Sequence, residues 1–204
     1  MAQFSSSSIR LLLAGCMLGL MGGLSACSSD PKLYTLAPLP GASQMGGPAV
    51  VEVRTPVVAM RLDRDTIVRA NQDYQTKLAS GDSWSEALPN MIAHTLTTDL
   101  AQRLPGTTVF AQDDAVTTTP SAYVEVTVRN FEADAAGHAL IMGMLSVHPA
   151  GKMIGPVLTQ PFVWKSSETV DKDTVKLTAA LSQGLSVLAD QIAAQVRALP
   201  APVK

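Results

Sequence analysis

The stretch AYVEVTVRNF, residues 122–131, alternates apolar and polar side chains with a period of two. This period is typical of a β-strand that has one face packed on a core and a wetter opposite face. One side carries Ala122, Val124, Val126 and Val128, and the other carries Tyr123, Glu125, Thr127 and Arg129. The stretch therefore predicts a sheet whose two faces differ.

Further strands are predicted on both sides of this stretch by β-branched and apolar runs. Pro161 lies inside the last run and favours an edge position or a β-bulge, because proline cannot donate to a β-ladder. Residues 79–82, ASGD, predict a turn. The candidate runs besides 122–131 are 32–36, 49–54, 66–70, 74–78, 107–111, 138–148 and 157–168, and we expect about six of all these candidates to form the sheet.

Two long amphipathic helices are predicted by apolar residues at helical spacing. The first covers 84–104 and begins near Ser85, because Pro89 is tolerated only in a first turn. The second covers 174–199, with Asp173 as its N-cap and a proline-rich segment after it. Residues 49–204 are thus expected to form a single α/β domain.

The first 26 residues have the pattern of a lipoprotein signal peptide. An apolar run of 14 residues, 11–24, follows Arg10 and is shorter than the roughly 20 residues of a membrane-spanning helix. The sequence LSAC at 24–27 then fits a lipobox, so Cys27 is the expected lipid anchor. Cys16 has a similar local context, but too few apolar residues precede it.

Lipidation of Cys27 predicts attachment to the periplasmic face of the outer membrane. Several acyl chains on one residue make release negligible. The next residue is Ser28, so no aspartate is present there to resemble an inner-membrane retention signal. Residues 27–48 are rich in proline and glycine, which predicts a flexible tether between the anchor and the domain.

Charge and composition exclude several classes of function. The chain has 204 residues, with 15 basic against 17 acidic side chains, and no basic stretch to bind nucleic acid. Cys16 and Cys27 are the only cysteines, so the domain has neither a disulfide framework nor a thiolate metal site. The three histidines fit no metal-ligand spacing, and no hydrolase or phosphate-loop motif occurs. We therefore expect neither enzymatic activity nor a cofactor.

Three methionines, Met142, Met144 and Met153, have two possible roles. They can pack under a helix, or they can form an adaptable apolar contact surface. The sequence alone favours core packing.

Several short motifs occur in an order that resembles the PqiC (YmbA) family of ABC-transporter auxiliary lipoproteins. They are CSS at 27–29, YTL at 34–36, LDR at 62–64, IVR at 67–69 and WSEAL at 84–88. The chain has Ala87 where the family usually has proline. The resemblance implies a mixed sheet with packed helices and no catalytic residues.

The resemblance also implies a partner and a role in membrane integrity. The domain would dock on a mammalian-cell-entry (MCE) protein that carries lipids between the two membranes, with a homo-oligomer such as a ring as one arrangement. Candidate contact residues, which carry the resemblance, are Arg61, Asp63, Arg64, Arg69 and Trp84. A surface turn at 63–64 and a core position for Trp84 are the structural alternatives.

Two other functions stay open at this point. The lipoprotein could instead be an envelope scaffold or assembly factor that activates a cell-wall synthase or assists outer-membrane biogenesis. The domain could also bind lipid directly, for which an apolar cavity of several hundred Å³ is expected.

Overall fold

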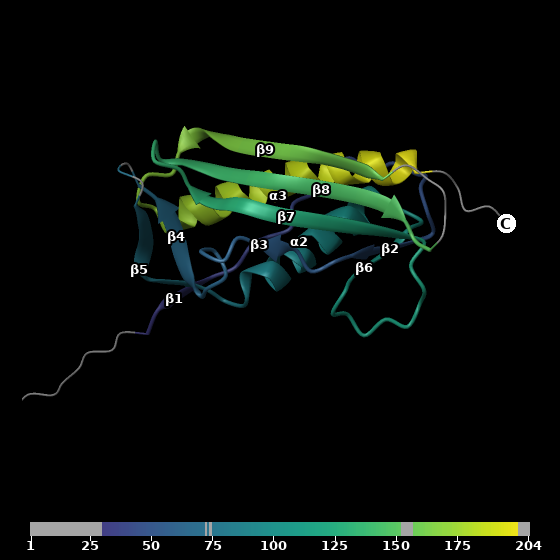
Figure 1. The fold of residues 1–204 in the computed structure, drawn as a ribbon, viewed down its shortest axis with the longest axis horizontal. Helices are drawn as coiled ribbons and strands as arrows, with labels where there is room; N and C mark the ends of the chain where they lie inside the picture. Colours follow the sequence, from purple (N-terminus) through teal and green to yellow (C-terminus); the bar gives the residue numbers. More distant parts are fainter. Residues whose placement is uncertain (1–29, 72, 74, 152–156, 200–204) are drawn as a thin grey trace, which may run out of the picture. The chain divides into compact units, whose positions relative to one another are not determined.

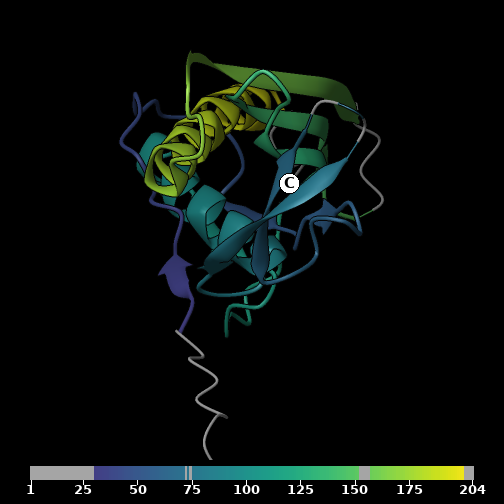
Figure 2. The same ribbon diagram turned by 90° about the vertical axis from the view of Figure 1, so that its left-hand side faces the viewer.

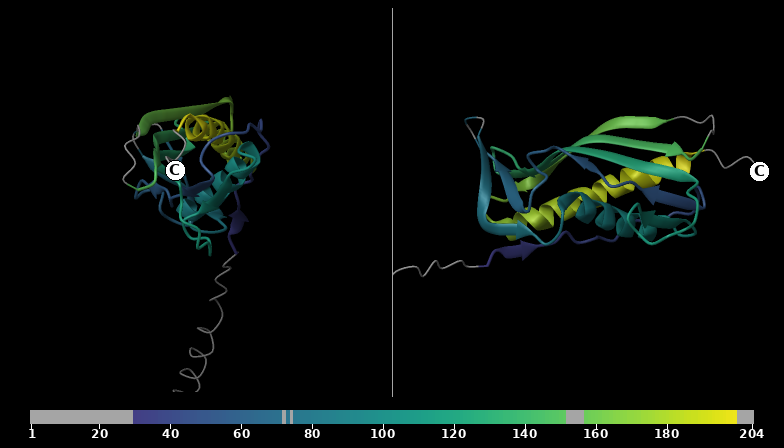
Figure 3. Two further views of the ribbon diagram at one scale, coloured as in Figure 1. Left: turned by 90° about the vertical axis from the view of Figure 1, so that its right-hand side faces the viewer. Right: turned by 60° about the horizontal axis from the view of Figure 1, so that its bottom comes forward.

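The computed structural model describes residues 30–71, 73, 75–151 and 157–199. The expected signal peptide and Cys27 lie outside the described residues. From Pro31 onward the described residues form a mixed sheet of nine strands with two helices on one face (Figures 1 and 3). The expected α/β class is confirmed, and the sheet has more strands than the six that we expected.

Three long strands form the antiparallel half of the sheet. β7 (Ala122–Ala133) pairs with β8 (His138–Pro149), and β8 pairs with β9 (Leu158–Thr169). The alternating stretch that begins at Ala122 thus lies in β7. Among the described residues β9 pairs only with β8, as the position of Pro161 predicted.

Short strands line the other side of β7 in parallel. β2 (Val50–Val53), β3 (Val57–Val58) and β4 (Thr66–Ala70) pair with successive parts of β7. β6 (Thr108–Ala111) runs parallel to β2, and β5 (Thr76–Trp84) runs antiparallel to β4. β1 (Lys32–Tyr34) closes this half by pairing in parallel with β5.

The helices α2 (Leu88–Arg103) and α3 (Thr174–Ala198) pack on each other and on the same face of the sheet (Figure 3). Asp173 caps α3 by accepting a hydrogen bond from the backbone N–H of Lys176. The apolar stripes of both helices are buried, as their spacing predicted. Burial of these stripes against the strands forms the core.

Gly184 lets α3 approach the sheet closely. A Cβ atom there would lie 2.5 Å from atoms of Ile141 and of the Trp164 ring, well inside van der Waals contact. Ile141 of β8 and Trp164 of β9 therefore face the helices, and their neighbours along each strand point to the opposite face.

The region around Trp84 differs from the sequence-based prediction. Residues 79–82 do not form the expected turn but continue β5, with Gly81 at a φ of 79°. Trp84 is the last residue of β5 rather than the first of a helix, and α2 begins at Leu88 with Pro89 in its first turn. Glycine permits the irregular backbone at this point of β5. Because β5 continues as far as Trp84, the helix begins only after it.

The expected flexible tether is not seen between Lys32 and Pro48. Beyond β1, the backbone N–H of Leu39 donates to Oδ1 of Asp99 at 2.7 Å, and that of Gln44 donates to the carbonyl of Arg103 at 3.0 Å. Leu36 is buried in the core. This proline- and glycine-rich segment is held by contacts with distant residues, which its composition does not reveal.

Arg103 and Asp99 form a buried polar pair under this segment. The Arg103 guanidinium donates to Asp190 of α3, to Ser186 of α3 and to the carbonyl of Leu39. Burial raises the pKa of Asp99 to about 6, although the Leu39 N–H and the Arg103 charge oppose the shift. One oxygen of Asp99, Oδ2, is buried with no hydrogen-bond partner among the described residues.

Among the described residues, no helix combines the length and the apolar character that a membrane span requires.

Candidate functional site: the open face of the sheet

The face of β7, β8 and β9 that points away from the helices is here called the open face. Cross-strand register places Met142 opposite Val163 and Met144 opposite Pro161, so each pair shares this face. No described element covers it (Figure 1). Its central side chains are Val57, Thr127, Leu140, Met142, Met144, Pro161 and Val163.

The positions of Met142 and Met144 decide between core packing and a contact surface, the two roles that the sequence left open. Both are half-buried side chains on the open face, whereas the neighbouring Ile141 and Leu145 are fully buried under the helices. The prediction of core packing is therefore wrong for these two residues, and Met153 lies outside the described residues. Val163 is 63% exposed, so the centre of the face is apolar and accessible.

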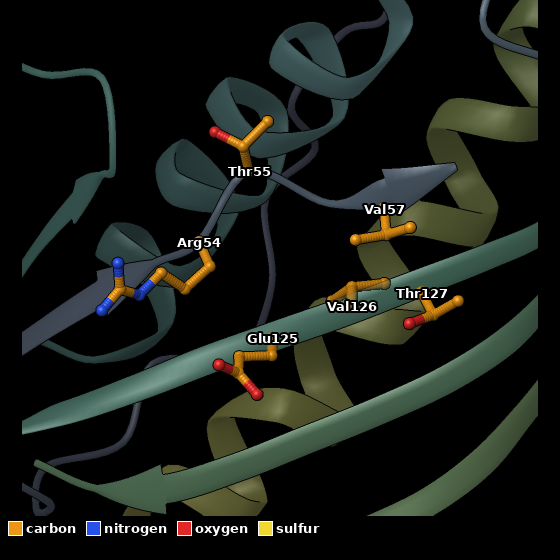
Figure 4. Close-up of a pocket in the computed structure, with 6 residues that line it drawn as sticks. All are labelled: Arg54, Thr55, Val57, Glu125, Val126 and Thr127. Carbon is orange, nitrogen blue, oxygen red and sulfur yellow. The ribbon is translucent and has the colours of Figure 1, made fainter. Parts of the chain in front are cut away.

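One end of the open face carries a cation–π pair. The Arg54 guanidinium lies 4.3 Å from the centre of the Tyr123 ring and pairs with Glu52 at 3.2 Å. Beside it a shallow groove of about 340 Å³ lies between β7 and the chain that leads from β2 into β3 (Figure 4). Its lining combines charged, polar and apolar side chains, namely Arg54, Thr55, Val57, Glu125, Val126 and Thr127.

Arg61 marks the other end of the open face. Its guanidinium donates to Glu132 at 2.5 Å, and Asn130 donates to the same carboxylate oxygen at 2.7 Å. Glu132 is on β7 and is buried beneath these donors, which compensates its charge. The turn that carries Arg61 continues into Asp63 and Arg64, both exposed.

Arg69 lies in a different cluster, at the N-terminal end of α3. It donates to the carbonyl of Asp171 at 2.8 Å and to Oγ1 of Thr174 at 3.1 Å. Burial lowers the pKa of the Arg69 guanidinium, while the nearby Asp82 and Asp173 carboxylates act against that shift. Arg69 thus holds β4 to α3 and is not part of the open face.

Trp84 occupies the core. It is 4% exposed, and its ring packs against Phe131 with 6.2 Å between the ring centroids. Of the five candidate contact residues, Arg61 lies at one end of the open face, and Asp63 and Arg64 are exposed on the turn that follows it. The structure places Arg69 in the α3 cluster and Trp84 in the interior.

The apolar centre of the open face was not predicted, since a contact surface was the less favoured of the two roles for Met142 and Met144. The signal was available, because the outward positions of 122–131 and 138–148 carry Tyr123, Thr127, Met142 and Met144. Residues 138–148 are apolar on both faces of the predicted strand, so the sequence did not show which face the helices cover.

One protein family matches most of the chain. Its description is ABC-type transport auxiliary lipoprotein component, and the match extends over residues 34–193. The chain belongs to this family. The resemblance to PqiC-like proteins is therefore confirmed, and this auxiliary lipoprotein has the family's general role in an ABC-type transport system of the cell envelope.

Two solved structures share the fold of this auxiliary lipoprotein. One, described as an uncharacterized protein, has a TM-score of 0.65 and 22% sequence identity, and covers 82% of this chain and 99% of its own. The other is a Xanthomonas campestris protein of the family DUF330, with a TM-score of 0.62, 18% identity and coverage of 83% and 95%. A comparison with curated proteins finds no match.

Within the described part of the auxiliary lipoprotein, no group of three His, Cys, Asp or Glu side chains is placed to hold a metal ion.

Proposed function

We propose that this protein is an outer-membrane lipoprotein, anchored through Cys27, whose domain docks on the MCE protein of a lipid transport system. It acts as a binding subunit without enzymatic activity. The family match carries this proposal, because it begins at Tyr34, seven residues after the lipobox cysteine. The predicted anchor and the family domain are thus directly consecutive in the chain.

The open face is the proposed docking surface. Protein interfaces commonly combine an apolar centre, enriched in methionine and aromatic side chains, with a polar rim. The open face has Met142, Met144 and Val163 at its centre, and Arg54 with Tyr123 at one end. Methionine side chains adapt to a partner at low cost because they are flexible and polarizable.

Arg61, Asp63 and Arg64 are proposed as the rim at the other end. Asp63 and Arg64 are exposed charged residues. Such charges at an interface affect how the partner is oriented and how fast it associates more than how tightly it binds. Arg61 donates a hydrogen bond to Glu132 and therefore fixes the position of the turn that carries Asp63 and Arg64.

The groove supports docking over lipid binding by the domain itself. A lipid-binding site is expected to enclose an apolar chain. The groove beside β7 is open to solvent, and Arg54 and Glu125 line it together with Val57 (Figure 4). Its shape and lining suit a protein side chain or loop.

Site-specific photo-crosslinking tests this proposal in cells. A photoreactive residue at Met144 is expected to capture the MCE protein. The matched control is Val187, which is partly exposed on α3, on the helical side of the domain. Capture from Val187 and not from Met144 would contradict the docking surface, and capture of a cell-wall synthase or barrel protein would support the envelope-scaffold alternative.

A further inference from the structure

We propose that the end of the domain formed by β1 and the first turn of α3 rests on the membrane surface, with Leu33 and Val175 in contact with lipid. This inference rests on the proposed anchoring through Cys27. It adds an orientation to the anchored domain and assigns a membrane-contact surface separate from the open face.

The length of chain between the anchor and the domain limits how far this end can lie from the bilayer. Five residue steps separate Cys27 from Lys32, and an extended chain covers at most about 3.6 Å per residue. Lys32 therefore lies within about 18 Å of the lipidated residue, whatever conformation the connection adopts. Since β1 begins at Lys32, no long tether lets the domain turn freely.

A hydrogen-bond network fixes β1 to the start of α3. The Tyr34 hydroxyl donates to Oδ1 of Asp82 at 3.3 Å, and the Thr174 hydroxyl donates to Oδ2 of the same carboxylate at 2.5 Å. Lys32 also pairs with Asp82 in the register of β1 and β5. Figure 2 looks onto this end, with β1 in purple and the first turns of α3 in yellow-green. The chain enters the domain beside the N-terminus of α3.

The side chains at this end suit a phospholipid surface. Leu33 is 64% exposed and Val175 is 66% exposed. Single exposed apolar residues are ordinary, but these two lie where the short connection holds the domain near the bilayer. Exposed lysines that can reach lipid phosphates lie next to them in the chain, namely Lys32, Lys172 and Lys176.

Acidic groups at the same end keep this surface from being strongly basic. Asp171 and Asp173 are exposed there, and Asp82 is held by Tyr34 and Thr174. The surface therefore orients a domain that the lipid anchor already holds, and it is not expected to bind vesicles tightly without the anchor.

The orientation leaves the proposed docking surface accessible. α3 has 25 residues, so its far end lies about 37 Å along the helix from the membrane-contact end. The open face lies on β7, β8 and β9, which run along the length of α3 (Figure 1). A partner arriving from the periplasm can then reach the open face.

Fluorescence of single labelled cysteines in proteoliposomes tests the inference. Cys27 is acylated in the lipoprotein, and the sequence after it contains no other cysteine, so an introduced thiol is labelled alone. Leu33→Cys and Val175→Cys carry an environment-sensitive dye in vesicles of phosphatidylethanolamine and phosphatidylglycerol. The matched control is Val163→Cys, a valine of similar exposure on the open face.

We expect blue-shifted emission and quenching by spin-labelled lipid at positions 33 and 175, and water-like emission at 163. Vesicle flotation reports the anchor separately. If the protein floats and only the label at 163 responds, or no label responds, the membrane-contact surface is wrong while the anchoring stands. If the protein does not float, the proposed anchoring fails and this inference fails with it.

Discussion

Arg103 of α2 donates a hydrogen bond from Nε to Oδ1 of Asp190 on α3, across 2.6 Å. Arg103 is almost fully buried, and its remaining donors bind Ser186 and the carbonyl of Leu39. One side chain thus joins both helices to the segment between β1 and β2, which holds the start of the family domain in place.

Replacing Arg103 with Ala should destabilise the domain. The change leaves the Leu39 carbonyl without its side-chain donor and the buried Asp99 carboxylate without its ion-pair partner, and breaking a buried pair typically costs about 3–5 kcal/mol. Chemical denaturation measures the free energy of unfolding. Arg64→Ala, at an exposed turn position, is the control and should change it by less than about 0.5 kcal/mol. Equal stability of the two variants would exclude a structural role for Arg103.

Asp99 should make stability fall as the pH rises from about 4 to 6. The pKa of its carboxyl group is raised from 3.8 to about 6 in the fold, so the folded state binds the proton more tightly than the unfolded chain. The contribution is on the order of 3 kcal/mol, is lost as the pH rises through about 6, and should be absent in Asp99→Asn. The readout is the difference in unfolding free energy between the two proteins at each pH, with Asp63→Asn as the exposed control. A constant difference across this range would contradict the prediction.

Gly184→Ala should destabilise the contact between α3 and the sheet. The added methyl group would meet the rigid ring of Trp164, and such overpacking costs about 1–3 kcal/mol. Alanine recovers about 1 kcal/mol of helix propensity, so a net loss of up to about 2 kcal/mol is expected. Thermal unfolding measures it, and Ala179→Leu, at an exposed position of the same helix, should be nearly neutral. A gain in stability at Gly184→Ala would show that α3 can shift without cost.

Trp84→Ala should act on folding rather than on partner contact. Removal of a buried tryptophan side chain typically costs about 3–5 kcal/mol, because the transfer energy is lost and a cavity remains. Arg64→Ala should instead leave stability unchanged and weaken recovery of the partner. A Trp84→Ala protein that is stable but fails to bind the partner would contradict this prediction and support Trp84 as a contact residue.

The long elements were predictable from sequence because each has its own periodicity. The strand from Ala122 and the helix from Thr174 carry apolar positions at the spacing of one face, and the run from His138 is long and nearly all apolar. β3 was not predicted, since Val57 and Val58 are too few residues to show a period.

The features that could not be predicted from the sequence depend on contacts between distant parts of the chain. The segment that ends at Pro48 has the composition of a tether, and only its hydrogen bonds to Asp99 and Arg103 show that it is fixed. Of the candidate site, the turn with Arg61, Asp63 and Arg64 could be predicted because its charges suggested a surface. Sequence could not tell which face of β8 the helices cover, so Met142 and Met144 were assigned to the core.

The central claim, that the open face docks on an MCE protein, is tested most directly by co-purification from solubilised envelopes. A charge at the centre of the face, Met144→Glu, should abolish recovery of the MCE protein while the unfolding free energy stays close to that of the wild type. Val187→Glu on α3 serves as the matched control and should bind normally. Undiminished recovery with a folded Met144→Glu protein would contradict the claim.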